Sequence, residues 1–271
     1  MTGMETSNLT KEKLRKMFAE GKRFDGRELL ESRDFEIEYD VSNKAEGSAR
    51  IKMGKTDVIV GVKMQVGEPY PDSPDEGNLM VSSDLLPMAS PRYESGPPKF
   101  DAIELPRLVD RAIRASDIID FKKLVIEEGK KVWTIVADIY PINDDGNIIE
   151  ASSLAALAAL KNAVFPEIDK EGKVDYDKKT KNKLPLAKEI IPISFSFYKL
   201  GDSIILDPTR EEEEACDARI TFGISNWNKQ IMLNSCQKKG KAILTSEEIE
   251  KIMEIIPKKF EEFNKKLKKF L

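Results

Sequence analysis

The chain has 271 residues, of which 40% are hydrophobic, and it carries a formal net charge of -4 and no histidine. The absence of histidine excludes a Ser-His or Cys-His nucleophile pair, a histidine general base and a histidine-bound metal, while the 2 cysteines lack the spacing of a disulfide framework or zinc site. Apolar runs too short to span a bilayer and a charged first segment predict a soluble cytoplasmic protein without membrane contact, in which RNA binding would require a local basic surface.

The first predicted elements are a short helix over residues 10–20, capped by Thr10, and a hairpin of roughly three strands over residues 35–62. Apolar residues alternate with polar ones along the hairpin, which is typical of strands with one buried face. The run Gly54–Thr56 resembles the end of a phosphate loop, but Ala49 stands where that motif needs glycine. We therefore interpret the run as a turn between two strands.

The middle of the chain contains, in order, a predicted strand over 78–86, a surface loop over 87–98, a helix over 100–119 that Pro106 starts or interrupts, a strand over 132–140 and an Ala/Leu helix over 151–164. This last helix has almost no charge, so we expect it to be buried in a central position. Residues 143–147 resemble part of a calcium loop, but Pro141 and Ser152 occupy its first and last ligand positions. We interpret this segment as a turn.

The last part of the chain begins with a polar, lysine-rich segment, followed by predicted strands over 190–198, 204–206, 217–224 and 230–235. A final helix is capped by Thr245 and Glu248, and one apolar face carries Ile249, Ile252, Met253, Ile256, Phe260 and Phe263. Strands followed by helices in both halves predict an α+β protein with a duplicated unit. Its expected parts are an N-terminal helix (1–22), a first lobe (23–168), a connecting segment (169–188) and a second lobe with the C-terminal helix (189–271).

Two charged segments could carry function. Arg107, Arg111 and Arg114 share one face of a helix, where they could bind successive RNA phosphates. From spacing alone, a solvent-facing stripe or ion pairs between subunits explain them equally well. The acidic run Glu211–Glu214 has a solvated edge as its simplest interpretation, although four carboxylates could bind a divalent cation.

Several segments, read in chain order, resemble the RNase PH family. The resemblance covers most of the chain from about residue 23 to 260. Its motifs are RFDGR at 23–27, GSA at 47–49, TDV at 56–58, RLVDRAIR at 107–114, DG at 145–146 with AS at 151–152, and LDPT at 206–209 with the acidic run that follows. The resemblance implies an RNase PH-like fold of two β-α lobes of the ribosomal-protein S5 domain 2-like type. It also implies assembly into six-membered rings.

The chain departs from this family at the two places that carry its chemistry. Active members bind inorganic phosphate through a Gly-[Ser/Thr]-Arg-[Ser/Thr] segment, where this chain has Asn147, Ile148, Ile149 and Glu150. Two isoleucines cannot bind phosphate, and we expect the charge of Glu150 to repel it, so this is a vestigial phosphate site. Active members also carry two aspartates six residues apart, where this chain has Asp207 and Glu213, a vestigial acidic site.

This combination resembles the non-catalytic ring subunit of the archaeal exosome, a phosphate-dependent 3'-to-5' exoribonuclease complex. The resemblance implies no catalytic residue, metal or cofactor of its own, and a catalytic RNase PH-like partner with which it forms a trimer of heterodimers and whose active site it helps to shape. Cap proteins with S1 or KH domains and single-stranded RNA are the other expected partners, with RNA contacting Arg107, Arg111 and Arg114.

Two other hypotheses stay open. The chain could be an autonomous exoribonuclease, Mg-dependent or phosphorolytic, that uses Asp207 and Glu213. It could also be a binding protein that functions without ring partners. RNA decay by the pure chain would favour the first of these, and a stable monomer that ignores the catalytic homologue would favour the second.

Overall fold

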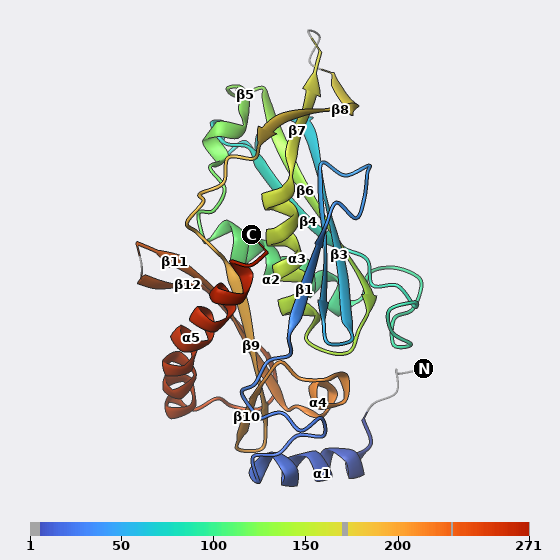
Figure 1. The fold of residues 1–271 in the computed structure, drawn as a ribbon, viewed down its shortest axis with the longest axis vertical. Coiled ribbons are helices and arrows are strands. Elements are labelled where there is room, and N and C mark those ends of the chain that lie inside the picture. Colours follow the sequence, from blue (N-terminus) through green and yellow to red (C-terminus); the bar gives the residue numbers. More distant parts are fainter. Residues whose placement is uncertain (1–5, 170–172, 229, 271) are drawn as a thin grey trace.

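The computed structural model describes residues 6–169, 173–228 and 230–270. Two lobes lie one above the other in Figure 1, each built from a sheet with helices against it. The buried helix α3 (Ile148–Asn162) runs from the upper lobe to the junction of the two. The predicted fold class, α+β with two β-α lobes, is therefore confirmed.

The upper lobe is built on a 6-stranded sheet of β1 (Phe35–Tyr39), β2 (Gly47–Met53), β3 (Thr56–Gly67), β4 (Asn78–Ser83), β5 (Val125–Glu127) and β6 (Lys131–Asn143). The order is β1-β2-β3-β6-β4, with β5 paired to β6, and only the β4–β6 pair is parallel. Val58, Val60 and Val62 of β3 are fully buried, as their alternation predicts. Gly54 lies in the turn between β2 and β3 with a φ of +58°, which confirms the turn interpretation of that run.

Helices α2 (Phe100–Arg114) and α3 pack against this sheet, and a short 3-10 helix, η1 (Phe121–Leu124), precedes β5. Every residue from 148 to 160 in α3 is buried, as expected for a central helix with almost no charge. The prediction for Pro106 is wrong, because it lies inside α2 and neither starts nor interrupts it. The buried side chains of Leu105 and Leu108 hold this part of the helix against the core and offset the lost backbone hydrogen bond.

The lower lobe contains a 4-stranded antiparallel sheet of β9 (Ile193–Leu200), β10 (Ser203–Leu206), β11 (Ala218–Trp227) and β12 (Gln230–Gly240), in the order β10-β9-β11-β12. A separate hairpin of β7 (Val164–Ile168) and β8 (Val174–Lys183) projects from the upper lobe in Figure 1. Strand β8 lies within the segment expected to connect the lobes. Half of the segment expected to connect the lobes, residues 169–188, is therefore a strand paired with β7.

Helix α5 (Ser246–Leu267) ties the two sheets together. Its Phe263 ring lies 5.7 Å from that of Phe35 on β1 and 5.2 Å from that of Phe195 on β9. The predicted capping box of Thr245 and Glu248 is confirmed. The predicted apolar face is only partly buried, because Ile249 and Met253 are 37% and 38% exposed at the margin of the surface that α5 covers.

Two further helices cover the lower end of the molecule, α1 (Asn8–Ala19) and α4 (Arg210–Ala215). The predicted cap of α1 is wrong: Ser7 caps it by accepting a hydrogen bond from the backbone N–H of Thr10 at 3.1 Å. The helix begins two residues earlier than expected because Ser7, too, has an oxygen that can cap it. Among the described residues, no helix combines the length and apolar character that a membrane crossing requires.

Candidate functional site

The two vestigial sites inferred from the sequence form one cluster where α3 begins. Asn147 joins them: its side-chain amide donates to Asp207 at 2.8 Å and to Glu150 at 2.9 Å. Its backbone N–H donates to Glu213 at 2.8 Å. One asparagine therefore gathers three carboxylates that lie up to 66 residues away in the sequence. We call Arg33, Asn147, Glu150 and Asp207 the buried cluster.

The turn that precedes α3 brings Asn147 into this position. Gly146 has a φ of +87°, and a Cβ atom there would lie 2.5 Å from the carbonyl oxygen of Pro208, so only glycine fits. The carbonyl of Gly146 accepts a hydrogen bond from the Thr56 hydroxyl at 2.7 Å. Asn147 follows with a φ of +56°, a left-handed conformation that asparagine tolerates better than most residues. The turn thus holds the first lobe against the Asp207 segment of the second.

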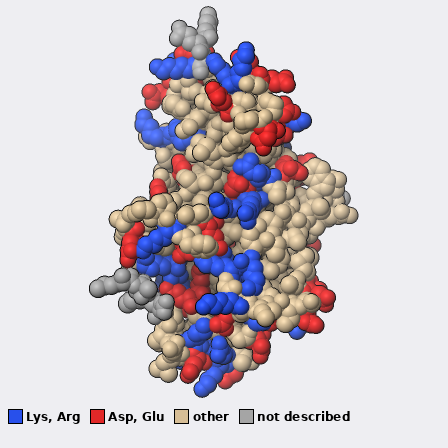
Figure 2. All heavy atoms as spheres, turned by 180° about the vertical axis from the view of Figure 1, so that it is seen from behind, with Lys and Arg blue, Asp and Glu red and all other residues tan. Residues whose placement is uncertain are grey.

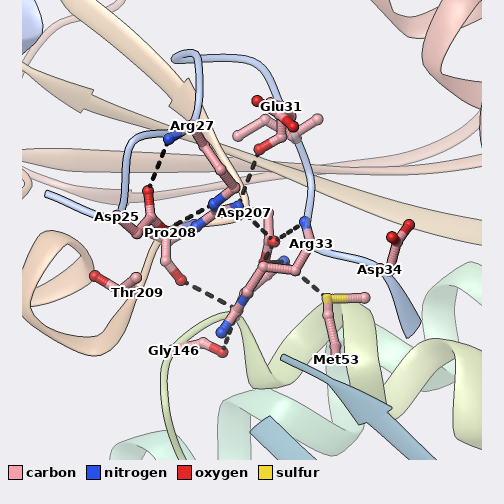
Figure 3. A network of polar contacts seen from close by, with 12 residues as sticks. Asp25, Arg27, Glu31, Arg33, Asp34, Met53, Gly146, Asp207, Pro208 and Thr209 are labelled. Atoms are coloured by element: carbon pink, nitrogen blue, oxygen red, sulfur yellow. Dashed lines mark hydrogen bonds and ion pairs between the residues drawn. The ribbon is translucent and has the colours of Figure 1, made fainter. Parts of the chain in front are cut away.

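Asp207 is fully buried and is held by arginine on both carboxylate oxygens (Figure 3). Arg33 donates from Nη2 to Oδ1 at 2.7 Å, and from Nε to Oδ2 at 2.9 Å, while its backbone N–H also reaches Oδ2. Arg27 adds a bond to Oδ2 at 2.9 Å. Burial by itself raises the pKa of Asp207, but the bonds and charge of Arg33 outweigh it and leave this pKa below its ordinary value.

Arg23 of the RFDGR run, like Arg27, binds the Asp207 segment of the second lobe. Arg23 has a fully buried side chain, which donates to the equally buried carboxylate of Glu212 and to the backbone carbonyl of Asp207 at 2.8 Å. The solvated-edge interpretation of the acidic run is therefore wrong for Glu212. Burial of that side chain is possible because the guanidinium neutralises it and the capping box of α4 uses it as well.

Glu150 is also fully buried, and it links α3 to the second lobe. Its Oε1 accepts the backbone N–H of Ser196 on β9 at 2.7 Å. Burial and then the neighbouring charge of Asp207 raise the pKa of Glu150 to about 8, so the protonated form is favoured far more than for an ordinary glutamate. The raised pKa weakens the charge by which Glu150 was expected to repel phosphate. Ile148 and Ile149, at the neighbouring positions, offer only buried aliphatic groups.

The carboxylate of Asp207 has no free oxygen in the buried cluster. All of the Asp207 oxygens are engaged by Arg27, Arg33 and Asn147. Within the part of the chain that the structure describes, no group of three or more acidic or cysteine side chains could hold a metal ion. Asp207 therefore lacks the open oxygen that a bound Mg²⁺ would need, while Glu213 accepts one bond, from the backbone N–H of Asn147.

The predicted arginine stripe lies elsewhere, on the outer face of α2. All three side chains are exposed, and none contacts the buried cluster. Arg114 pairs with Asp110 at 2.7 Å and donates to the carbonyl of Leu79 at 3.0 Å. Arg107 and Arg111 have no ion pair or hydrogen bond with any residue that the structure describes. Two arginines of the stripe are therefore available for a ligand.

Arg33 is the important residue that the sequence did not single out. It lies outside the RFDGR run, and its partner Asp207 is 174 residues away. The only available signal was the motif just before it, whose Arg23 and Arg27 bind the same segment of the second lobe. An excess of arginine before the first strand could have suggested a buried carboxylate partner, but not which one.

Two lobes of this form, with a glycine turn and a polar cluster at the start of the central helix, define an RNase PH-like protein. Residues 31–166 match domain 1 of the 3' exoribonuclease family, and residues 191–255 match its domain 2. The chain belongs to this family, which confirms the resemblance of its motifs to RNase PH.

Its relatives narrow the comparison. The chain is 41% identical over 252 residues to the exosome complex component Rrp42 of Methanothermobacter thermautotrophicus, covering 93% of this chain and 91% of that protein. It is 47% identical over 221 residues to that of Pyrobaculum aerophilum, covering 81% and 80%. In structure it is similar to a chain of the Archaeoglobus fulgidus exosome with RNA bound to the active site, with a TM-score of 0.82, 39% identity and coverage of 92% and 93%.

Proposed function

We propose that this chain is a non-catalytic, RNA-contacting subunit of an archaeal exosome ring. It alternates with a catalytic RNase PH-like subunit in a trimer of heterodimers, carries S1 or KH cap proteins on the ring and works in the cytoplasm. The similarity to exosome components over more than nine-tenths of the chain supports the assembly. The main observation that supports a non-catalytic role concerns Asp207, at the first acidic position of the family. Its carboxylate is buried, and both oxygens accept hydrogen bonds from arginine or asparagine.

The vestigial phosphate site supports the same proposal. Ile148 and Ile149 stand where active relatives place a hydroxyl residue and the phosphate-binding arginine, respectively, and both are buried. A phosphorolytic enzyme needs a group that positions the attacking phosphate, and an aliphatic side chain offers no donor. The contribution of this chain to RNA decay is then to shape the active site of its partner and to hold RNA.

The RNA contact in this proposal belongs to Arg107 and Arg111, with a smaller part for Arg114. Exposed guanidinium groups without acidic partners bind phosphates without competition, and such contacts read no base identity. On the face drawn in Figure 2, basic and acidic side chains are intermingled, and the net charge is -4. We therefore expect weak long-range attraction and binding that depends on these local contacts.

The alternative of an autonomous nuclease requires Asp207 and Glu213 to bind a metal or the leaving oxygen. The arginine bonds of Asp207 oppose this, because they would have to be broken inside the protein. The alternative of a stand-alone binding protein is opposed by the similarity to exosome components, which covers 93% of the chain.

RNA decay assays test these proposals. The pure chain should release no nucleotide from single-stranded RNA with phosphate or with Mg²⁺, and decay should appear after mixing with the catalytic subunit of the same organism. Decay by the pure chain that disappears in a Glu213→Gln variant would support the autonomous nuclease and reject our proposal. Native mass measurement of the mixture provides the assembly readout: a persistent monomer beside the catalytic subunit would reject the ring.

A further inference from the structure

Phe100, the first residue of α2, is an exposed aromatic residue that the proposed function does not use. It is 63% exposed, more than any other phenylalanine in the described part of the chain; the next are Phe24 at 41% and Phe270 at 38%. Exposure alone does not make a site, because single apolar residues are common on protein surfaces. The position of Phe100 on α2 is the feature that points to a ligand.

Phe100 lies on the same face of α2 as the two unpaired arginines. Arg107 follows it by seven residues and Arg111 by eleven, and at about 3.6 residues per turn both intervals return to nearly the same direction. With a rise of about 1.5 Å per residue, Phe100 lies about 10 Å along the helix from Arg107, and Arg107 lies about 6 Å from Arg111. One exposed line therefore carries an aromatic ring followed by two guanidinium groups.

A lysine holds the Phe100 ring from one side. Nζ of Lys239 lies 4.7 Å from the ring centroid, a cation–π contact. This ammonium group is fixed in turn by Asp101 at 2.8 Å and by Glu104 at 3.0 Å. The cation covers one side of the ring, and most of the residue remains open to solvent. A ring that is already positioned loses less conformational freedom when a ligand stacks on it.

The charges along α2 favour an anionic ligand beside this ring. The acidic residues of the helix all have basic partners: Asp101 pairs with Lys239, Glu104 with Lys239 and Arg219, and Asp110 with Arg114. Arg107 and Arg111 keep their charges without an acidic partner among the described residues. An apolar protein surface would bury these charges unpaired, which is unfavourable. A single-stranded RNA instead offers phosphates to the guanidinium groups and a base to the ring.

We propose that Phe100 stacks on a base of the single-stranded RNA whose phosphates are bound by Arg107 and Arg111. This inference rests on the proposed function and adds a base contact to it. Stacking tolerates every base because each has a π face, so the contact reads no sequence by hydrogen bonds. Purines overlap a ring more extensively than pyrimidines, and we therefore expect a modest purine preference at this one nucleotide.

RNA affinity of the assembled ring tests the proposal, measured in phosphate-free buffer so that phosphorolysis cannot shorten the RNA. Phe100→Leu keeps an apolar side chain but removes the π face, and we expect about five- to tenfold weaker binding. Phe100→Trp keeps a stacking surface and should bind at least as tightly as the wild type. A purely apolar contact with a protein would tolerate leucine.

RNAs that carry one abasic nucleotide at successive positions identify the stacked base. Removal of that base should weaken binding to the wild-type ring about as much as Phe100→Leu does. The Phe100→Leu ring should not respond to the same removal, because the two changes delete one contact. Independent losses at every position would reject stacking on Phe100.

Phe24→Leu is the matched control. Phe24 is also exposed, and Nζ of Lys13 lies 5.2 Å from its ring centroid, but it precedes the first strand and is not part of α2. RNA affinity should therefore stay at the wild-type value. An equal loss in this control, or wild-type affinity in Phe100→Leu, would overturn the proposal.

Native mass measurement checks assembly of the same variants. A ring that fails to form with Phe100→Leu would assign Phe100 to a subunit interface and also overturn the proposal. Weaker RNA binding after Arg107→Glu plus Arg111→Glu, with no effect of Phe100→Leu, would reject the stacking and leave the proposed function intact. A wild-type ring that binds no RNA would instead reject the RNA role in the proposed function itself.

Discussion

Two arginine-rich regions of this protein differ in what surrounds the guanidinium groups. In the buried cluster, Arg33 is 10% exposed and both of its terminal nitrogens meet oxygen atoms of the protein. On the outer face of α2, Arg107 and Arg111 are exposed and meet none in the described structure. Both regions come from segments that resemble motifs of one family, yet the first serves the fold and the second is open to a ligand.

The comparison teaches that arginine content by itself does not locate an RNA-binding surface. A guanidinium that is buried with a carboxylate has its charge cancelled, and breaking such a pair leaves an unpaired buried ion. An exposed guanidinium contributes little to the stability of the folded state, so it is free to bind a ligand. The two regions should therefore respond in opposite ways to mutation: stability in one, RNA affinity in the other.

The strongest test of this division removes Arg33. Arg33→Ala leaves the buried carboxylate of Asp207 with only Arg27 and Asn147 as side-chain partners, so we expect a loss of about 3–5 kcal/mol in the free energy of unfolding. Chemical denaturation of the isolated chain measures it. Arg107→Ala is the matched control and should change stability by less than about 0.5 kcal/mol. Similar losses in the two variants would remove the distinction between the regions.

The next effect is a pH dependence that belongs to the buried cluster. The pKa of Glu150 rises from an ordinary 4.5 to about 8 in the folded protein. Between these values the folded state keeps a proton that the unfolded state has released, so this group makes stability fall as pH rises. Below pH 4.5 and above pH 8 its contribution levels off. Asp207 acts oppositely: its pKa is lowered, so its stabilisation is lost as pH falls below the ordinary carboxyl range.

A Glu150→Gln variant isolates this contribution, because glutamine keeps the shape of the protonated acid. We expect the wild type to lose roughly 1–2 kcal/mol relative to the variant between pH 6 and pH 8. Denaturation curves at a series of pH values measure the difference. Parallel pH profiles for the two proteins would mean that Glu150 does not carry a proton in the folded state.

For the exposed arginines of α2, the double variant Arg107→Glu plus Arg111→Glu should lower RNA affinity and leave the stability of the fold unchanged. We expect about tenfold weaker binding of single-stranded RNA by the assembled ring, with unchanged unfolding of the isolated chain. The slope of affinity against salt should also flatten, because fewer phosphates are neutralised. If the variant fails to assemble, the arginines belong to a subunit interface instead. If RNA binding is unchanged over the salt series, they bind no phosphate.

The sequence predicted the elements of the fold well because their signals are local. The alternating valines of β3, the apolar residues of α3 and the capping box of α5 are each patterns of residues close together in the sequence, and all three were confirmed. The errors at Ser7 and Pro106 were also local. Several residues can cap a helix start, and tertiary packing overrides the cost of an internal proline.

The site was less predictable, because its contacts join distant segments. The motifs identified Asp207 and residues 147–150 as positions of interest but could not reveal that Arg33 would occupy the carboxylate. Glu212 was read as part of a solvated acidic run, since its partner Arg23 is 189 residues away. The raised pKa of Glu150 follows from its burial beside Asp207, which no spacing in the sequence encodes.

The smallest expected effect concerns Arg114, which is exposed like Arg107 and Arg111 but paired with an acid like the buried arginines. It lies on the exposed stripe, yet it is paired with Asp110 on the preceding turn and bonded to the carbonyl of Leu79. Exposed ion pairs at this spacing contribute little, so Arg114→Gln should change the free energy of unfolding by less than about 0.5 kcal/mol. Its RNA affinity in the ring should fall less than that of Arg111→Gln, because phosphate must compete with Asp110 for this guanidinium. A larger loss of RNA affinity for Arg114→Gln than for Arg111→Gln would show that Asp110 positions Arg114 for RNA. The distinction between paired arginines that stabilise the fold and unpaired arginines that bind RNA would then hold only for buried pairs.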